Sequence, residues 1–197
     1  MQDILERFAF DNICKVAFNV DPACLGGDGT SGGEFMRAFE DAATLSSGRF
    51  IDIVISFILA GRDTTSSALS WFFWLLSLNP DVERNILKEL ETIRSSNGKN
   101  LGDTYSFEEL RDMHYLQAAI SETLIRTECT GKRVHSSFLY SMMGQECVWG
   151  KTWMKSIAAS VIERFEIDVQ NKENCPEHLL SLTLRMKGGL QVKVTGR

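Results

Sequence analysis

The sequence has no apolar run long enough to cross a bilayer, which takes about 20 mostly apolar residues. Its most apolar segment, residues 51–78, is interrupted at the centre by six polar residues at 62–67. An arginine and an aspartate at a helix centre each add about 2.5–3.5 kcal/mol to the free energy of membrane insertion. No charged and then apolar leader of the secretory kind follows Met1. We therefore predict no transmembrane span, and a chain that is soluble or has lost an anchor.

Cysteines, histidines and basic residues are too few or too scattered for several classes of site. The five cysteines are odd in number and form no C-x-x-C pair, which argues against a disulfide scaffold and for a reducing compartment or a former membrane-facing enzyme. The three histidines, His114, His135 and His178, show no metal-ligand spacing. A net charge of −5 argues against a nucleic-acid partner. The glycine-rich stretch 26–33 lacks the Lys-Ser/Thr ending of a phosphate loop, so we interpret it as a linker.

The polar residues inside the apolar segment form a notch that can serve chemistry. Gly61 has no side chain, so a bulky group can lie against the backbone there. Thr64 can return its hydroxyl to the carbonyl of Ala60, which bends a helix and opens a groove. Asp63 beside Thr64 then offers a carboxylate and an alcohol to one pocket, a pair suited to proton delivery. The alternative is a polar face turned to solvent, and helix geometry alone does not decide between the two.

The sequence of the notch resembles a motif of a known protein family. AGRDTT, at 60–65, resembles the oxygen-activation motif of the cytochromes P450, on the long central helix that crosses the haem. The surrounding DIVISFILAGRDTTSSALSWFFWLLSLNPDVE is similar to the plant fatty-acid ω-hydroxylase branch over its whole length. Residues 6–25, 105–124 and 154–194 resemble the same branch. The resemblance therefore covers most of the chain.

The resemblance implies a mainly α, partial cytochrome P450 fold with a long central helix, paired helices and a C-terminal β-hairpin. It implies that Asp63 and Thr64 are catalytic residues that help to deliver protons, and that Ala60 and Gly61 bind the haem cofactor. It implies hydroxylation of fatty acids or fatty-acid-derived conjugates, with electrons from a P450 reductase at the endoplasmic reticulum membrane. For this anchorless chain we expect a cytoplasmic or unstable protein.

The chain departs from the family at the haem-ligand loop. The family places a Phe, a Gly, an Arg, a Cys and a Gly at fixed spacing, and the cysteine thiolate binds the iron. That spacing is absent here. The segment 144–151, GQECVWGK, is superficially similar to the loop. Cys147 lacks the preceding Arg, however, and is only a weak candidate for the metal ligand. We expect the remaining cysteines to be inert thiols: Cys14, Cys24, Cys129 and Cys175.

The family's constant ion pair, a Glu and an Arg three residues apart on a helix, is also altered. Glu122 is present, but the arginine is Arg126, one residue late. Residues at i and i+4 can still touch, although the extra residue rotates the arginine by about 100°. We therefore predict an ordinary surface pair, worth a few tenths of a kcal/mol.

Length indicates a single incomplete P450-like domain over residues 1–197, because the chain is less than half of a P450. Breaks in the resemblance predict internal joins near 50/51, 125–139 and 151–153. We predict that the chain as written is inactive. Two alternatives stay open: a non-catalytic helical remnant that binds lipid or a partner, and a mis-joined gene model.

Local signals predict most of the helices. Periodicity predicts helices over residues 3–20 and around Phe35, Phe39, Ala42 and Ala43. Asn79 as cap with Pro80 at the first position predicts a helix start. Ser106 with Glu109 predicts a capping box, and the helices after it extend to about Arg126. A further apolar stripe contains Trp153, Met154, Ile157, Ala158, Val161, Ile162 and Phe165.

Two expectations concern the C-terminus and the surface. Residues 180–186 and 190–194 alternate in polarity around Gly188 and Gly189, which predicts a hairpin between them.

The central helix lacks segments that would cover it in the resembled family. We therefore expect a large exposed apolar patch made of Phe57, Trp71, Phe72, Phe73 and Trp74.

Overall fold

The computed structural model describes residues 1–18, 21–25, 38, 41, 49–126, 148–179 and 185–197. This part of the chain is mainly helical with short antiparallel strands, which confirms the predicted fold class. The second predicted helix, around Phe35, lies outside it. The helices are α1 (Gln2–Phe18), α3 (Arg49–Leu78), α4 (Pro80–Asn97), α5 (Phe107–Asp112), α6 (His114–Arg126) and α8 (Val148–Arg164). The strands are β1 (Phe165–Val169), β2 (His178–Leu179), β3 (Arg185–Met186) and β4 (Val192–Gly196).

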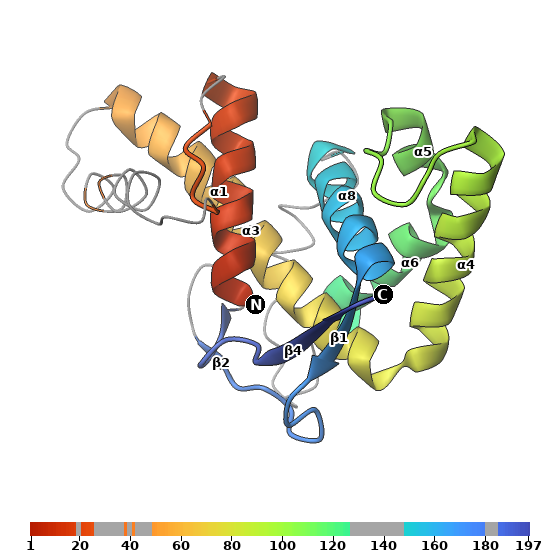
Figure 1. Ribbon diagram of the computed structural model, residues 1–197. Coiled ribbons are helices and arrows are strands. Elements are labelled where there is room, and N and C mark those ends of the chain that lie inside the picture. The colour runs from red at the N-terminus through yellow and green to blue at the C-terminus, as the bar shows by residue number, and fades with distance from the viewer. Residues whose placement is uncertain (19–20, 26–37, 39–40, 42–48, 127–147, 180–184) are drawn as a thin grey trace.

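The long helix α3 runs through the molecule and contacts most of the other elements (Figure 1). α1 packs along it, and α4, α6, α8, β1 and β3 also contact it. These elements bury its aromatic residues, so the predicted exposed patch is wrong for Trp71, Phe72, Phe73 and Trp74. The side chain of Phe57 lies outside the described residues. No described helix combines the length and the apolarity that crossing a bilayer requires.

α4 begins where the sequence predicted, but Asn79 does not cap it as predicted. Pro80 occupies the first turn, with Asp81 and Glu83 beside it. Asn79 makes no side-chain cap to α4. Its Nδ2 instead donates to the carbonyl of Leu75 at 2.8 Å, so the amide closes the end of α3. The two helices are only one residue apart, and the side chain satisfies an orphan carbonyl of the preceding helix.

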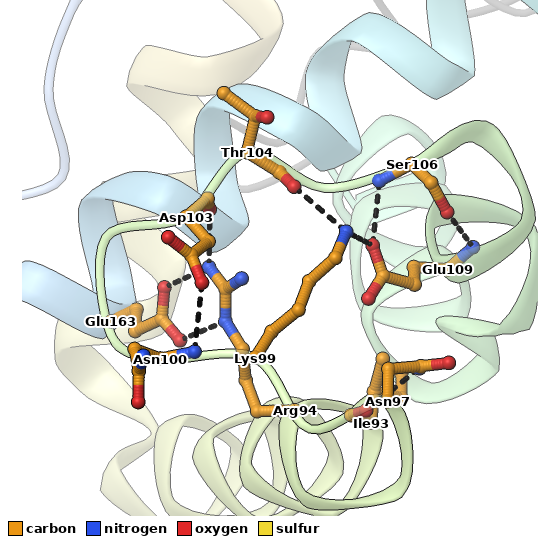
Figure 2. Close-up of polar contacts among 10 residues, drawn as sticks. All are labelled: Ile93, Arg94, Asn97, Lys99, Asn100, Asp103, Thr104, Ser106, Glu109 and Glu163. Atoms are coloured by element: carbon orange, nitrogen blue, oxygen red, sulfur yellow. Dashed lines mark hydrogen bonds and ion pairs between the residues drawn. The ribbon is translucent and has the colours of Figure 1, made fainter.

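The capping box before α5 is confirmed. The Glu109 amide donates to Ser106 Oγ at 3.3 Å, and the Ser106 amide donates to Glu109 Oε2 at 2.6 Å. Lys99 Nζ donates to the same carboxylate oxygen at 2.6 Å and to the Thr104 carbonyl at 3.0 Å. The loop between α4 and α5 is therefore fixed at both ends by one glutamate and one lysine (Figure 2).

A buried ion pair joins α4 to α8. Arg94 donates from Nε and Nη2 to the two carboxylate oxygens of Glu163, each at 2.8 Å, with side chains 8% and 7% exposed. Arg94 Nη2 also donates to the Asp103 carbonyl at 2.8 Å, and the guanidinium lies 3.9 Å from the centre of the Tyr105 ring. Figure 2 shows the arginine between the loop and Glu163. The sequence analysis did not find this pair.

The α6 N-terminus is capped from another helix. Glu89 of α4 accepts hydrogen bonds from the amides of Tyr115 and Leu116, at 2.7 and 2.9 Å. A carboxylate at this end also opposes the positive end of the helix dipole. α4 is therefore bonded to both α6 and α8.

The strands pair differently from the predicted hairpin. β4 pairs with β1 in an antiparallel register, from Phe165 opposite Gly196 to Val169 opposite Val192. β3 pairs with β2. The turn at Gly188 and Gly189 does form, with φ of 79° and 70°. Leu190 is then buried in the core, which separates β4 from β3 and brings it beside the strand that leaves α8. Phe165 belongs to that strand and is exposed, so its place in the helical stripe was wrong.

Glu122 is exposed on α6, and the side chain of Arg126 lies outside the described residues. The predicted pair between them stays a prediction. α3 continues through residues 50 and 51, and α8 continues through 151–153. The predicted joins at those positions therefore fall inside helices, whereas the third, at 125–139, lies mostly outside the described part.

We predict that Arg94→Met lowers the free energy of unfolding by roughly 3–5 kcal/mol, because it leaves Glu163 buried without a counter-charge. Urea denaturation measures the effect. The double variant Arg94→Met/Glu163→Leu should recover most of the loss, since no buried charge remains. Arg84→Ala, which removes an exposed pair with Asp81, is the control and should leave stability unchanged. Equal losses in Arg94→Met and Arg84→Ala would contradict this assignment.

Arg126→Ala should cost under about 1 kcal/mol, because its expected partner Glu122 is on the surface and exposed ion pairs are weak. The same urea experiment checks it. A loss as large as that of Arg94→Met would show that Arg126 belongs to a buried network.

Candidate functional site

The polar notch of α3 is buried. Arg62, Thr64, Thr65, Ser66 and Ser67 are all shielded from solvent, and Gly61 and Asp63 are half-buried. The alternative of a polar face turned to solvent is therefore wrong. The notch is therefore a buried polar part of an apolar helix. Its use in chemistry stays a prediction.

Arg62 and Asp63 form an ion pair within the notch. Arg62 Nε donates to Asp63 Oδ1 at 2.7 Å, with side chains 6% and 24% exposed. Neighbouring helical residues point about 100° apart and do not normally face each other. The arginine stem must therefore fold back to reach the carboxylate. Burying a guanidinium is costly without a partner, and this contact supplies one.

Ser66 and Ser70 bond to the carbonyls of α3 itself. Ser66 Oγ donates to the Asp63 carbonyl at 3.3 Å, and Ser70 Oγ donates to the Ser66 carbonyl at 2.7 Å. Such back-bonding satisfies buried hydroxyls without help from another element. Within the described part of the chain, Ser67 Oγ is buried without a hydrogen-bond partner.

The described cysteines do not fit a haem-thiolate site. Burial raises the pKa of Cys14 to about 11 and that of Cys24 to about 12, and the charge of Asp11 adds to both shifts. A thiolate ligand needs the opposite environment. Cys175 is exposed on the loop after β1. The described residues contain no group of three or more His, Cys, Asp or Glu that could hold a metal ion.

Cys129 and Cys147 lie outside the described residues. Cys147 directly precedes α8 in the sequence. The resemblance places the family's ligand cysteine shortly before this helix as well. Cys147 therefore stays the one candidate ligand that the sequence analysis named.

A separate groove of about 420 Å³ lies between α3, the start of α4 and α6. Its lining is mostly apolar, with four polar side chains among the lining residues. The hydroxyl of Tyr115 accepts a hydrogen bond from Asn85 Nδ2 at 3.2 Å. The lining residues are Phe72, Leu75, Leu76, Asn79, Val82, Tyr115, Ala118, Ala119, Glu122 and Thr123.

The structure places the predicted site residues in two regions. Gly61, Asp63 and Thr64 share the notch, whereas Glu122 lines the groove together with Phe72. Phe72 is nine residues beyond Asp63, about 14 Å along the helix. The side chains of Ala60 and Arg126 are not described. The sequence analysis missed Arg62, although a charge inside an apolar helix next to an aspartate was the available signal.

Comparison with known proteins gives consistent matches. Residues 33–127 match the cytochrome P450 family. Cytochrome P450 CYP94D108 of Paris polyphylla is 30% identical and aligns with 98% of the chain. Cytochrome P450 94B1 and cytochrome P450 86B1 of Arabidopsis thaliana are 28% and 27% identical, and each aligns with 100% of the chain.

The chain spans only part of these relatives: 65% of the Paris polyphylla protein, and 64% and 60% of the two Arabidopsis proteins. The first alignment extends over 322 positions, although the chain has 197 residues, so part of that relative has no counterpart within the aligned region. The matches include the α3 segment that forms the buried notch. On these matches, the chain is a shortened member of the cytochrome P450 family.

Proposed function

We propose that the parent reaction of this chain is hydroxylation, near the chain end, of a fatty acid or fatty-acid-derived conjugate, and that the 197 residues do not perform it alone. The observation that supports this proposal of hydroxylation is the burial of the notch, in which α3 retains Asp63 and Thr64. The substrate class rests on the resemblance of residues 6–25, 105–124 and 154–194, and of the α3 segment, to the ω-hydroxylase branch.

The cytochrome P450 family implies haem, which supplies oxygen activation when bound. Because the described cysteines do not fit the ligand role, we derive no step through haem in this chain. The side chains of the notch contact one another in a structure that contains no haem. Arg62 Nε orients the Asp63 carboxylate, and Thr64 follows it on the buried side of the helix. This arrangement supports the proton-delivery role that the resemblance implies for Asp63 and Thr64.

The proposed loss of activity rests on the absence of the family's haem-ligand loop from the sequence. The Phe, Gly, Arg, Cys and Gly spacing of the ligand loop is absent from all 197 residues. The loop supplies the sulfur ligand together with the groups that support it, and such supporting contacts determine the character of a metal ligand. A P450 reductase and a fatty-acid-type molecule are the partners that we propose for the parent enzyme only.

We predict that the chain, purified and reconstituted with haem, forms no thiolate-ligated centre. The measurement is the Soret band after reduction and addition of carbon monoxide. We expect no red-shifted band of the kind that a thiolate ligand produces.

Cys147→Ser is the decisive control for this measurement. A red-shifted band that is present in the natural chain and lost in Cys147→Ser would contradict the proposal and assign Cys147 as the ligand. Cys175→Ser is the matched control, because Cys175 is exposed and follows β1, whereas Cys147 directly precedes the start of α8.

A mis-joined gene model remains an alternative that the long alignment favours. It predicts unused coding sequence beside the codons for Phe50 and Leu124, which includes the ligand loop. Sequencing the transcript and the surrounding genomic DNA measures this. Uninterrupted codons in both would leave the shortened chain as the natural product.

A second candidate function is non-catalytic binding of a fatty-acid-type molecule in the groove between α3, α4 and α6. Its volume of about 420 Å³ is within the range of ligand sites, and its lining is mainly apolar. Ala118→Trp should fill the groove and weaken binding of a fluorescent fatty acid at least tenfold. Glu108→Trp, on α5 and away from the groove, is the control. Equal binding by both variants would exclude this function.

A further inference from the structure

Two buried cysteines lie beside one carboxylate at the C-terminal end of α1. Cys14 belongs to α1 and Cys24 to the segment 21–25, and they are 1% and 3% exposed. Both are in the thiol form. Asp11 lies on α1, three residues before Cys14, so their Cβ atoms are about 5–6 Å apart on one helix face.

Asp11 attaches the segment 21–25 to α1. Its Oδ1 accepts the Cys24 amide at 3.0 Å, and its Oδ2 accepts the Leu25 amide at 3.3 Å. A second carboxylate, Asp21, accepts the Ala23 amide and Lys15 Nζ, each at 3.1 Å. These contacts hold Cys24 against the part of α1 that carries Cys14.

We propose that Cys14 and Cys24 are a modification site for a small-molecule disulfide of the glutathione type, which converts them into an intramolecular disulfide, and that Asp11 controls the rate. The inference does not depend on the proposed function. The disulfide would add a covalent link between α1 and the segment 21–25, which the two hydrogen bonds of Asp11 already join.

The exchange balances in two steps. The Cys24 thiolate attacks one sulfur of oxidised glutathione, forms a mixed disulfide and releases one glutathione thiolate. The Cys14 thiolate then attacks the Cys24 sulfur, which forms the Cys14–Cys24 bond and releases the second glutathione. Two protein thiols are oxidised and one glutathione disulfide is reduced. Each protein thiol gives up its proton to solvent, and each released glutathione thiolate takes one up.

Asp11 disfavours the reactive thiolate of both cysteines in the folded chain. Burial raises the pKa of both thiols, the carboxylate adds to the shift, and the thiolate is the reactive form. Both thiols are also too little exposed, at 1% and 3%, for a molecule as large as glutathione to reach them. The reaction therefore requires a local opening, and the two hydrogen bonds that Asp11 makes to the segment 21–25 resist the release of Cys24.

The test exposes the reduced full-length chain to oxidised glutathione at pH 8, followed by acid quenching, digestion and mass spectrometry. We expect a linked pair of peptides containing Cys14 and Cys24, with two hydrogens fewer than the reduced peptides. Asp11→Asn should form it about tenfold faster, the effect of losing one charge-assisted hydrogen bond. Asp3→Asn, an exposed change on the same helix, should match the natural chain.

Cys175 reports that the oxidant is active, since this exposed cysteine should form a mixed disulfide first. Separate glutathione adducts on Cys14 and Cys24, with no linked peptide, would show that the sulfurs cannot meet and would overturn the proposal. Equal rates in Asp11→Asn and Asp3→Asn would overturn the role of Asp11. The natural chain alone shows whether the Cys14–Cys24 disulfide forms. That part of the test therefore holds even if Asp11→Asn folds poorly.

Discussion

Burial of α3 is the constraint on which the rest of the structure depends. This helix carries a charged pair, several hydroxyls and four large aromatic residues into the interior. The aromatic residues need apolar neighbours, which α1, α6, α8 and β1 provide. The polar groups need hydrogen bonds, and α3 supplies many of these itself through Arg62 with Asp63 and through the back-bonded serines. The surrounding elements can therefore pack on α3 mainly as apolar surfaces.

The elements around α3 are held to one another by charged groups from distant parts of the chain. Arg94 and Glu163 are 69 residues apart, and Glu89 caps a helix 26 residues later. Both interactions begin on α4, which makes this helix the connection between α6 and α8. These contacts explain how a P450-family chain of only 197 residues can still hold its helices in a defined arrangement.

Local signals in the sequence predicted local structure well. Pro80 and the Ser106–Glu109 box gave the starts of α4 and α5, since both depend on residues within one turn. The β4–β1 pairing, the Arg94–Glu163 pair and the burial of Trp71 depend on partners far along the chain, which periodicity cannot identify. At the site, the roles that the resemblance implies for Asp63 and Thr64 stay predictions. Arg62 was missed because neighbouring helical residues do not usually pair.

The central claim is that the shortened chain buries α3 as part of one folded unit, with the notch intact. Hydrogen–deuterium exchange of the amides at residues 62–76 tests it most directly, because these amides exchange only when the helix opens. The account predicts that they are among the slowest in the chain, as slow as the amides of α8 around Ala158, and that they are released together in denaturant. Exchange at these residues as fast as at the exposed loop 171–175 would contradict it.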